Sequence, residues 1–296
     1  MSEYTLNIAD YIILFNAMTG DTVLSPSARQ RSFMTTATDY HLAVNVFRGP
    51  VKVNEQATAV FRAPYVEEVG GMRLKKNDEF WTVYRLGDYI LVKTTCPVSP
   101  GHKEALLVIR PGEKSWDIII DSAGPEIDPL VYPVDGLLLY YLTALQGDIF
   151  IHGSGVYHKE KGYLFTGPSG KGKTTMAQLF SEAGADVVHD DRLILRKKND
   201  SIYMYNTPVY DNDRHRSCRL DSLFVIDHGD ENVSSAFGQT DAITSVMANC
   251  IQHHWDTRLI AKLTGAIIEL VKSVNIRKLH FVPKSTVVSF IENNEY

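Results

Sequence analysis

The sequence predicts a β-rich N-terminal domain, residues 1–124, followed by an α/β domain, residues 125–296. Three observations predict this fold class. Residues 1 to about 122 contain short runs of β-branched and aromatic residues separated by turn residues. The segment 122–129 combines two prolines, a glycine and two acids, which is typical of a linker. Beyond it, a glycine-rich loop stands between a strand pattern and a helix pattern. A length of 296 residues also fits two domains of about 150 residues each.

The first part of the chain is expected to form strands and hairpins. Apolar runs at 12–15 and 42–47 are typical of strands. Later runs form two expected hairpins, each closed by a short turn that contains glycine: 80–84 with 89–92, and 105–110 with 116–120.

The second part mixes helices and strands. Pro133 is expected to begin a helix that runs to about residue 145, with Gly147 as its stop. Apolar residues at helical spacing predict two more helices, 243–251, with Thr240 as its N-cap, and 259–271. Two final apolar runs are expected to be closing strands: 279–282 and 287–291.

Composition excludes several classes of protein. Thirty basic and 35 acidic residues give a net charge of −5, which excludes the strongly basic signature of a nonspecific nucleic-acid binder. The three cysteines are far apart and odd in number, which indicates a reducing compartment. The N-terminus lacks the pattern of a signal peptide, and the most apolar stretch, 134–145, is too short for a membrane span of about 20 residues. We expect a cytoplasmic protein without nucleic-acid or membrane partners.

The strongest motif is a phosphate-binding loop of the form G-x-x-x-x-G-K-[ST]. Its residues are Gly167, Pro168, Ser169, Gly170, Lys171, Gly172, Lys173 and Thr174. Glycines let backbone N–H groups turn toward a phosphate, and the following helix start adds unpaired N–H groups. Lys173 is expected to reach the β- and γ-phosphates and Thr174 to ligate Mg²⁺. We expect the loop and the next residue, Thr175, to bind nucleotide. Lys171 could instead be a solvated lysine, and the alternative for the whole motif is an ordinary glycine-rich turn.

Two adjacent acids follow the loop. Asp190 and Asp191 come after the short strand pattern Val187–Val188, 17 residues beyond Lys173. A helix of about 11 residues returns the chain by roughly 16 Å, so we expect the acids at the end of the strand adjacent to the loop. One carboxylate could hold Mg²⁺ and the other accept a proton, and repulsion between them should raise one pKa. The alternative is a solvated turn.

Other polar residues near the motif are more ambiguous. Segments 149–158 and 163–166 are expected to form a hairpin that brings His152 to the edge of the phosphate loop. A lone histidine is as often structural, and His189 is less favoured still. The polar segment 210–219, with three arginines, is either a lid or acceptor-binding loop or a mobile surface loop.

The order of histidine, phosphate loop and acid pair resembles the catalytic domain of HPr kinase/phosphorylase, which is related in fold to phosphoenolpyruvate carboxykinase. The resemblance covers about residues 130–290 and is most specific over 148–196. It implies a kinase that uses ATP and Mg²⁺ and acts on a serine-type hydroxyl. It also implies that Asp190 and Asp191 share metal binding and proton abstraction, with His152 near the reacting phosphate. Relatives of this domain assemble into oligomers, so a homo-oligomer stays open.

The sequence departs from that family at two points. Thr175 stands where the family has an acidic residue after its motif serine, and the family's glycine-rich signature loop is not visible over 207–227. We therefore expect a diverged member that acts on another acceptor: a peptide, a protein or a small hydroxyl compound.

The sequence disfavours three other classes of nucleotide-binding protein. Signatures of a transporter ATPase and of a guanine-binding GTPase are absent from the sequence, and about 160 residues precede the loop, unlike in guanylate kinases. A non-catalytic nucleotide-binding sensor or partner protein stays open, because a phosphate loop alone establishes binding and not transfer. Carboxykinase-like chemistry rests on analogy of fold alone.

Overall fold

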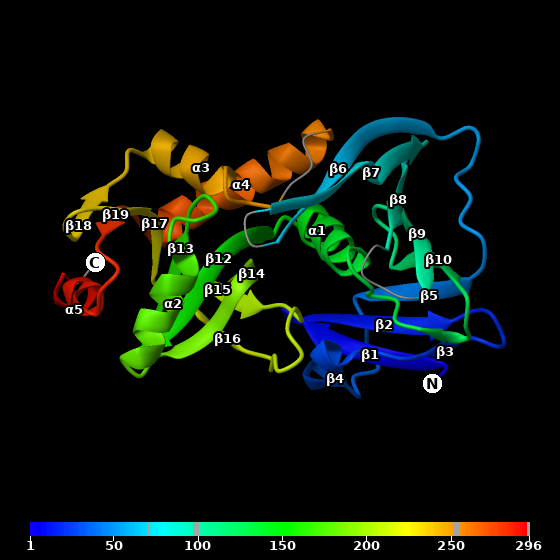
Figure 1. The fold of residues 1–296 in the computed structure, drawn as a ribbon, viewed down its shortest axis with the longest axis horizontal. Helices are drawn as coiled ribbons and strands as arrows, with labels where there is room; N and C mark the ends of the chain where they lie inside the picture. Colours follow the sequence, from blue (N-terminus) through cyan, green and yellow to red (C-terminus); the bar gives the residue numbers. More distant parts are fainter. Residues whose placement is uncertain (70–71, 97–100, 252–254, 295–296) are drawn as a thin grey trace. The chain divides into compact units, whose positions relative to one another are not determined.

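The structure is a computed structural model that describes residues 1–69, 72–96, 101–251 and 255–294 (Figure 1). The chain divides into two compact units, Met1–Tyr141 and Leu142–Tyr296. The division falls within α1 (Val134–Gln146), later than the boundary expected at residue 124. The reason is that the residues after 124 bind to the N-terminal unit. The strand β11 (Glu126–Ile127) pairs with β3 (Val23–Leu24), and Asp135 accepts a hydrogen bond of 3.0 Å from Arg29.

The N-terminal unit is built on a mixed sheet, which confirms its β-rich character. Within its described residues, nine strands follow the order β4-β1-β2-β5-β10-β9-β8-β7-β6. Both expected hairpins form, since β7 pairs with β8 and β9 with β10. A short 3₁₀ helix covers Ala28–Phe33. The strands are β1 (Glu3–Ile8), β2 (Tyr11–Ala17), β4 (Met34–Thr35), β5 (Leu42–Arg48), β6 (Thr58–Val69), β7 (Met72–Leu86), β8 (Tyr89–Thr95), β9 (His102–Ile109) and β10 (Ser115–Ser122).

The C-terminal unit has a second mixed sheet, of order β16-β15-β14-β12-β13-β17-β19-β18 in its described part. Among the described strands of this sheet, only the pairs β13–β17 and β17–β19 are parallel. The strands are β12 (Ile149–His158), β13 (Lys161–Thr166), β14 (Asp186–Lys198), β15 (Ser201–Asn206), β16 (Ser217–Arg219), β17 (Ser222–His228), β18 (Val233–Ala236) and β19 (Asn275–Phe281). The two sheets and their helices make this a mixed α/β protein.

Helices cover both faces of the second sheet (Figure 1). On one face, α3 (Gln239–Met247) and α4 (Thr257–Ser273) share an apolar core with Leu164 and Leu223. On the other, α2 (Lys173–Glu182) and α5 (Thr286–Asn293) pack with Phe165 and Phe224. The neighbouring residues of β13 and β17 thus point to opposite faces, as the alternation of a strand requires. Both faces are buried, which explains the nearly continuous apolar runs of these strands.

Three expectations about the secondary structure of this unit are wrong. The run 287–291, expected to be a strand, is the helix α5, because its buried residues Val287, Val288 and Ile291 repeat at helical spacing. Thr240 is not an N-cap, since α3 begins at Gln239 after Gly238. The same helix ends at Met247, short of the expected residue 251. Its last apolar residues pair instead with β12, where Ile251 donates a 2.7 Å backbone hydrogen bond to Phe150.

The helix expected from Pro133 to about residue 145 is confirmed as α1, and Gly147 ends it with φ of +80°. The helix expected over 259–271 is confirmed as α4, whose N-cap Asp256 accepts a hydrogen bond from the backbone of Arg258. In the described parts of the chain, no helix is both long and apolar enough to cross a membrane.

Gly162 at the start of β13 is the tightest glycine position of this sheet. A Cβ there would lie 1.9 Å from the backbone oxygen of Arg219, and the Gly162 N–H donates to Asp221 at 2.8 Å. Because the clash is with backbone, we expect Gly162→Ala to destabilise the protein by about 3 kcal/mol. Gly265 is the matched control. It lies exposed within α4 with nothing within 4 Å of its Cβ position, so Gly265→Ala should stabilise by about 0.5–1 kcal/mol. Urea unfolding followed by circular dichroism measures both, and equal shifts would contradict the steric argument.

Candidate functional site

The glycine-rich loop lies between β13 and α2, as the sequence predicts. Gly170 and Gly172 have φ of +79° and +91°, the left-handed region that glycine adopts without strain. A Cβ on Gly172 would also lie 2.7 Å from the Phe281 ring, so the loop packs closely against β19. Gly172 is the N-cap of α2 and offers no side-chain cap. The first N–H groups of α2 therefore lack a side-chain partner, which makes this end of the helix suited to an anion.

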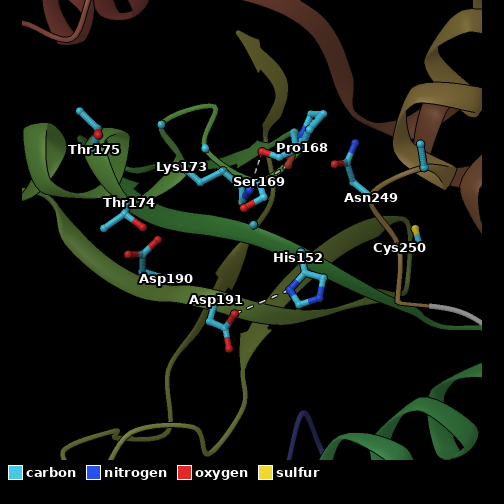
Figure 2. A pocket seen from close by; sticks show the side chains of 15 residues that line it. His152, Pro168, Ser169, Lys173, Thr174, Thr175, Asp190, Asp191, Asn249 and Cys250 are labelled. Atoms are coloured by element: carbon cyan, nitrogen blue, oxygen red, sulfur yellow. Dashed lines mark hydrogen bonds and ion pairs between the residues drawn. The ribbon is translucent and has the colours of Figure 1, made fainter. Parts of the chain in front are cut away.

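The loop forms part of a pocket of about 750 Å³ (Figure 2). The pocket collects almost all of the residues that the sequence predicts for the site, from β12, the loop, α2 and β14. It is lined by His152, Gly153, Gly167, Pro168, Ser169, Gly170, Gly172, Lys173, Thr174, Thr175, Asp190, Asp191, Ala248, Asn249 and Cys250.

Lys173 is held by the loop that it follows. Its ammonium donates to the carbonyl oxygens of Gly167 at 2.8 Å and Pro168 at 3.0 Å. Burial lowers its pKa, while the negative charges of Asp190 and Asp191 act in the opposite direction. The loop, the lysine and both acids are therefore close enough to interact electrostatically.

The acid pair lies in the middle of a strand, and not at its end as expected. Asp190 and Asp191 belong to β14, which continues because Leu193 to Leu195 pair with Ile149 to Ile151 of β12. The strand adjacent to the loop's strand is also not β14, since β12 lies between β13 and β14. The acids still reach the loop, because both line the same pocket.

The two acids have different partners. The Ser154 hydroxyl donates to Asp190 Oδ1, and Ser154 lies directly opposite Asp190 in the strand pair. Asp191 Oδ1 is 3.7 Å from His152 Nδ1 (Figure 2). Burial acts to raise the pKa of Asp191, but the contact with His152 and the charge of Arg192 outweigh it, so this pKa lies below its ordinary value. The expectation of a raised pKa is therefore wrong for Asp191, because His152 and Arg192 stabilise its carboxylate.

His152 lies where the sequence places it, at the pocket edge, with 53% of its side chain exposed. The hairpin of β12 and β13 carries it, and its carbonyl accepts a 2.6 Å hydrogen bond from the Thr166 hydroxyl just before the loop. Its backbone N–H donates to Asn249 at 3.1 Å. The backbone of this histidine is thus fixed, while its imidazole faces the pocket.

His189 does not line the pocket and instead anchors a loop beside the acids. Its Nδ1 accepts from the Arg192 N–H, so Nε2 carries the proton and donates to Asp213 at 3.3 Å. Asp213 also accepts from the backbone of Tyr210. The phenol of Tyr210 donates to the carbonyl oxygen of Asp190 at 3.1 Å. The first part of the polar segment 210–219 is therefore tied to β14 next to the acid pair.

Lys171 is the one predicted loop residue that does not line the pocket. Its Nζ lies 2.9 Å from Asp227 Oδ1 at the end of β17. The neighbouring His228 contacts the carbonyl oxygen of Gly170 at 3.2 Å. This side of the loop is thus held by β17, away from the acid pair.

Sequence reasoning missed four residues that line the pocket: Gly153, Ala248, Asn249 and Cys250. A Cβ on Gly153 would lie 2.9 Å from Leu164 Cδ1. A glycine within a strand indicates such close packing, so Gly153 was a signal in the sequence beside His152. The segment 248–250 gives no local signal. It reaches the pocket through pairing with β12, as the bridge between Cys250 and Ile151 shows.

Cys250 is a poor nucleophile despite its place in the pocket lining. Burial raises the pKa of its thiol, and burial likewise raises the pKa of Cys96 and Cys218 to about 12. Since the thiolate is the reactive form, we expect the folded protein at about pH 8 to react with iodoacetamide on the order of a thousandfold more slowly than free cysteine. Protein unfolded in urea is the control and should react normally. Peptide mapping that finds rapid labelling of a native thiol would refute this.

The described residues contain no group of three or more histidine, cysteine or acidic side chains that could hold a metal ion. The pocket instead offers oxygen donors, the Thr174 hydroxyl and the carboxylates of Asp190 and Asp191. Mg²⁺ takes one or two carboxylates together with substrate phosphates and water, so this donor set fits Mg²⁺ and not zinc.

Comparison with known proteins adds a distant similarity of fold. No protein-family model matches the chain, and no curated protein matches it. Among solved structures, the Hpr(Ser) kinase/phosphatase from Coxiella burnetii matches with a TM-score of 0.28 and 10% sequence identity, over 49% of this chain and 96% of that chain. The resemblance to that protein is partial and concerns the fold alone.

Proposed function

We propose that this protein is an ATP-dependent kinase that transfers the γ-phosphoryl group of MgATP to a hydroxyl acceptor on a peptide, a protein or a small molecule. The observation that carries the proposal is one pocket lined by the glycine loop, Lys173, Thr174 and the acid pair Asp190–Asp191. Phosphoryl transfer requires a loop that binds the phosphates, beside carboxylates that can hold a metal ion and accept a proton.

The loop and α2 would bind the phosphates. The N–H groups around Gly170 and Gly172 and at the start of α2 are free of side-chain caps and would donate to phosphate oxygens. Lys173 would exchange its two carbonyl partners for the β- and γ-phosphates. Bound Mg²⁺ would neutralise developing charge on the phosphates, held by the Thr174 hydroxyl and a carboxylate.

The acid side of the pocket would activate the acceptor. In the transfer, the acceptor oxygen forms a bond to the γ-phosphorus, the bond from that phosphorus to the β,γ-bridging oxygen breaks, and ADP leaves. The acceptor's proton passes to Asp191 or to the adjacent imidazole of His152, whose Nδ1 is 3.7 Å from that carboxylate. The loop around Tyr210, anchored beside Asp190, would border the entry of the acceptor.

The test uses γ-labelled ATP, Mg²⁺ and a host-type cell extract separated into protein and small-molecule fractions. Label that appears in one fraction, and is lost with Lys173→Ala and with Asp190→Asn, supports the kinase and identifies the class of acceptor. No transfer in either fraction, together with tight MgATP binding, refutes the kinase.

A non-catalytic nucleotide-binding protein is the second candidate. The lowered pKa of Asp191 favours it, because a carboxylate with a low pKa is a weak base. In that case nucleotide binding would remain, and substitution of either acid would alter no activity.

A further inference from the structure

Ser154 is a fully buried hydroxyl beside the acid pair that the proposed reaction does not yet use. It has no exposed surface and lies on β12, directly opposite Asp190 on β14. Side chains paired directly across two antiparallel strands lie on the same side of the sheet. The Ser154 hydroxyl uses this position to donate to Asp190 Oδ1.

The contact distinguishes the two acids. Asp191 lies opposite Gly153, which has no side chain to donate, and its carboxylate is turned to the His152 imidazole. Asp190 is held at both ends, since Ser154 binds its carboxylate and the Tyr210 phenol binds its carbonyl oxygen. In Figure 2, Asp190 lies toward Thr174 and Asp191 toward His152.

The position of Lys173 explains why such a hold is needed. The negative charges of Asp190 and Asp191 both attract the Lys173 ammonium across the pocket. An Asp190 side chain free to rotate could pair with this ammonium, and it would then be lost to a metal ion while it hindered the phosphates. A hydrogen bond to Oδ1 restrains the rotation of the carboxylate and would leave Oδ2 for a metal ion. Hydrogen-bond donors behind a ligating carboxylate usually change metal affinity by about 10- to 100-fold when removed.

We infer that Ser154 is a positioning residue that holds Asp190 as the metal-binding carboxylate, while Asp191 with His152 serves the proton transfer. The inference rests on the proposed binding of a metal–nucleotide complex in this pocket. It does not depend on transfer to an acceptor, and so it can be tested by binding alone.

The experiment measures the affinity of ATP by calorimetry, first with EDTA and then with Mn²⁺, and the affinity of Mn²⁺ itself by electron paramagnetic resonance in the presence of ADP. For Ser154→Ala we expect metal-free ATP binding to stay within about twofold. The gain in affinity from Mn²⁺ should fall about tenfold, and Mn²⁺ should bind about tenfold more weakly. Asp190→Asn should remove the gain, and Asp191→Asn should leave most of it.

Ser222 provides the matched control, because it is another buried serine of the same sheet, on β17. Ser222→Ala should leave the gain from Mn²⁺ unchanged. Equal losses with and without metal in Ser154→Ala would overturn the inference, because they would indicate a general loss of pocket structure. An unchanged gain from Mn²⁺ in Ser154→Ala, or a larger loss in Asp191→Asn than in Asp190→Asn, would also overturn it. If the unaltered protein binds no nucleotide at all, the proposed function itself fails first.

Discussion

Replacement of Lys173 by alanine is expected to lower phosphoryl transfer by about 10²- to 10³-fold, the usual loss when one charged or polar group that stabilises the transition state is removed. Lys173 lines the pocket, and its ammonium donates to the carbonyl oxygens of Gly167 and Pro168. These partners can be exchanged for phosphate oxygens without loss of a buried ion pair. The same substitution should weaken binding of ATP and ADP but leave thermal stability nearly unchanged. Calorimetry and the labelled-ATP assay measure the two effects.

Lys171 supplies the matched control, two residues earlier in the same loop. Its side chain is 39% exposed and pairs with Asp227 outside the pocket lining. Surface ion pairs of this kind contribute about 0–1 kcal/mol, and Lys171 does not line the pocket, so Lys171→Ala should change transfer by less than about fivefold. Equal losses in the two variants would show that the loop responds to its total charge and not to the position of Lys173.

The central motif could be predicted from sequence because its determinants are local. The residues from Gly167 to Thr174 specify the turn, the helix start and the charge within eight positions, and the structure places them from the end of β13 to the first turn of α2. The hairpin of β12 and β13 is similarly local, with Lys159 and Glu160 both at positive φ in its turn.

The surroundings of the motif depend on pairings between distant residues, which local patterns do not encode. The sequence predicts that the acids end the strand next to the loop. In fact the apolar residues Leu193 to Leu195 extend β14, and β12 is inserted between it and β13. Asn249 reaches the pocket only because the chain after α3 pairs with β12, about a hundred residues earlier. The proposed role of Ser154 could not be predicted from the sequence either, because it depends on the register that places Ser154 opposite Asp190.

The strand expected at 287–291 is a helix because tertiary packing outweighs local propensity there. The run 287–291 has five residues rich in valine and isoleucine, which favour strands. Its apolar residues pack onto the core with α2, and that contact requires the helical face of α5. The strand propensity of five residues contributes less free energy than the burial of one side of a helix. Tertiary packing therefore determines that this segment is helical.

Replacement of Asp191 by asparagine is expected to lower transfer by about 10²- to 10⁴-fold, the range that a general base contributes. Asparagine keeps the size of the side chain but cannot take the acceptor's proton. Nucleotide binding should persist, because Asp191 pairs with His152 and Arg192, which both lie outside the loop. The measurement is single-turnover transfer at saturating MgATP, with ATP affinity determined on the same sample. Asp200→Asn, in the exposed turn between β14 and β15, is the matched control and should behave like the unaltered protein.

The dependence of transfer on pH tests the low pKa of Asp191. The pKa of Asp191 lies below its ordinary value of 3.8, so its carboxylate stays charged above about pH 4. Because this pKa is lowered on folding, the stability that Asp191 contributes is present above the unfolded pKa and is lost as the pH falls through the folded one. With Asp191 as the proton acceptor, transfer should therefore stay constant between about pH 5 and 8. A rise over this range that is absent from Asp191→Asn would show that Asp191 titrates there and that the charges around it do not hold its pKa down.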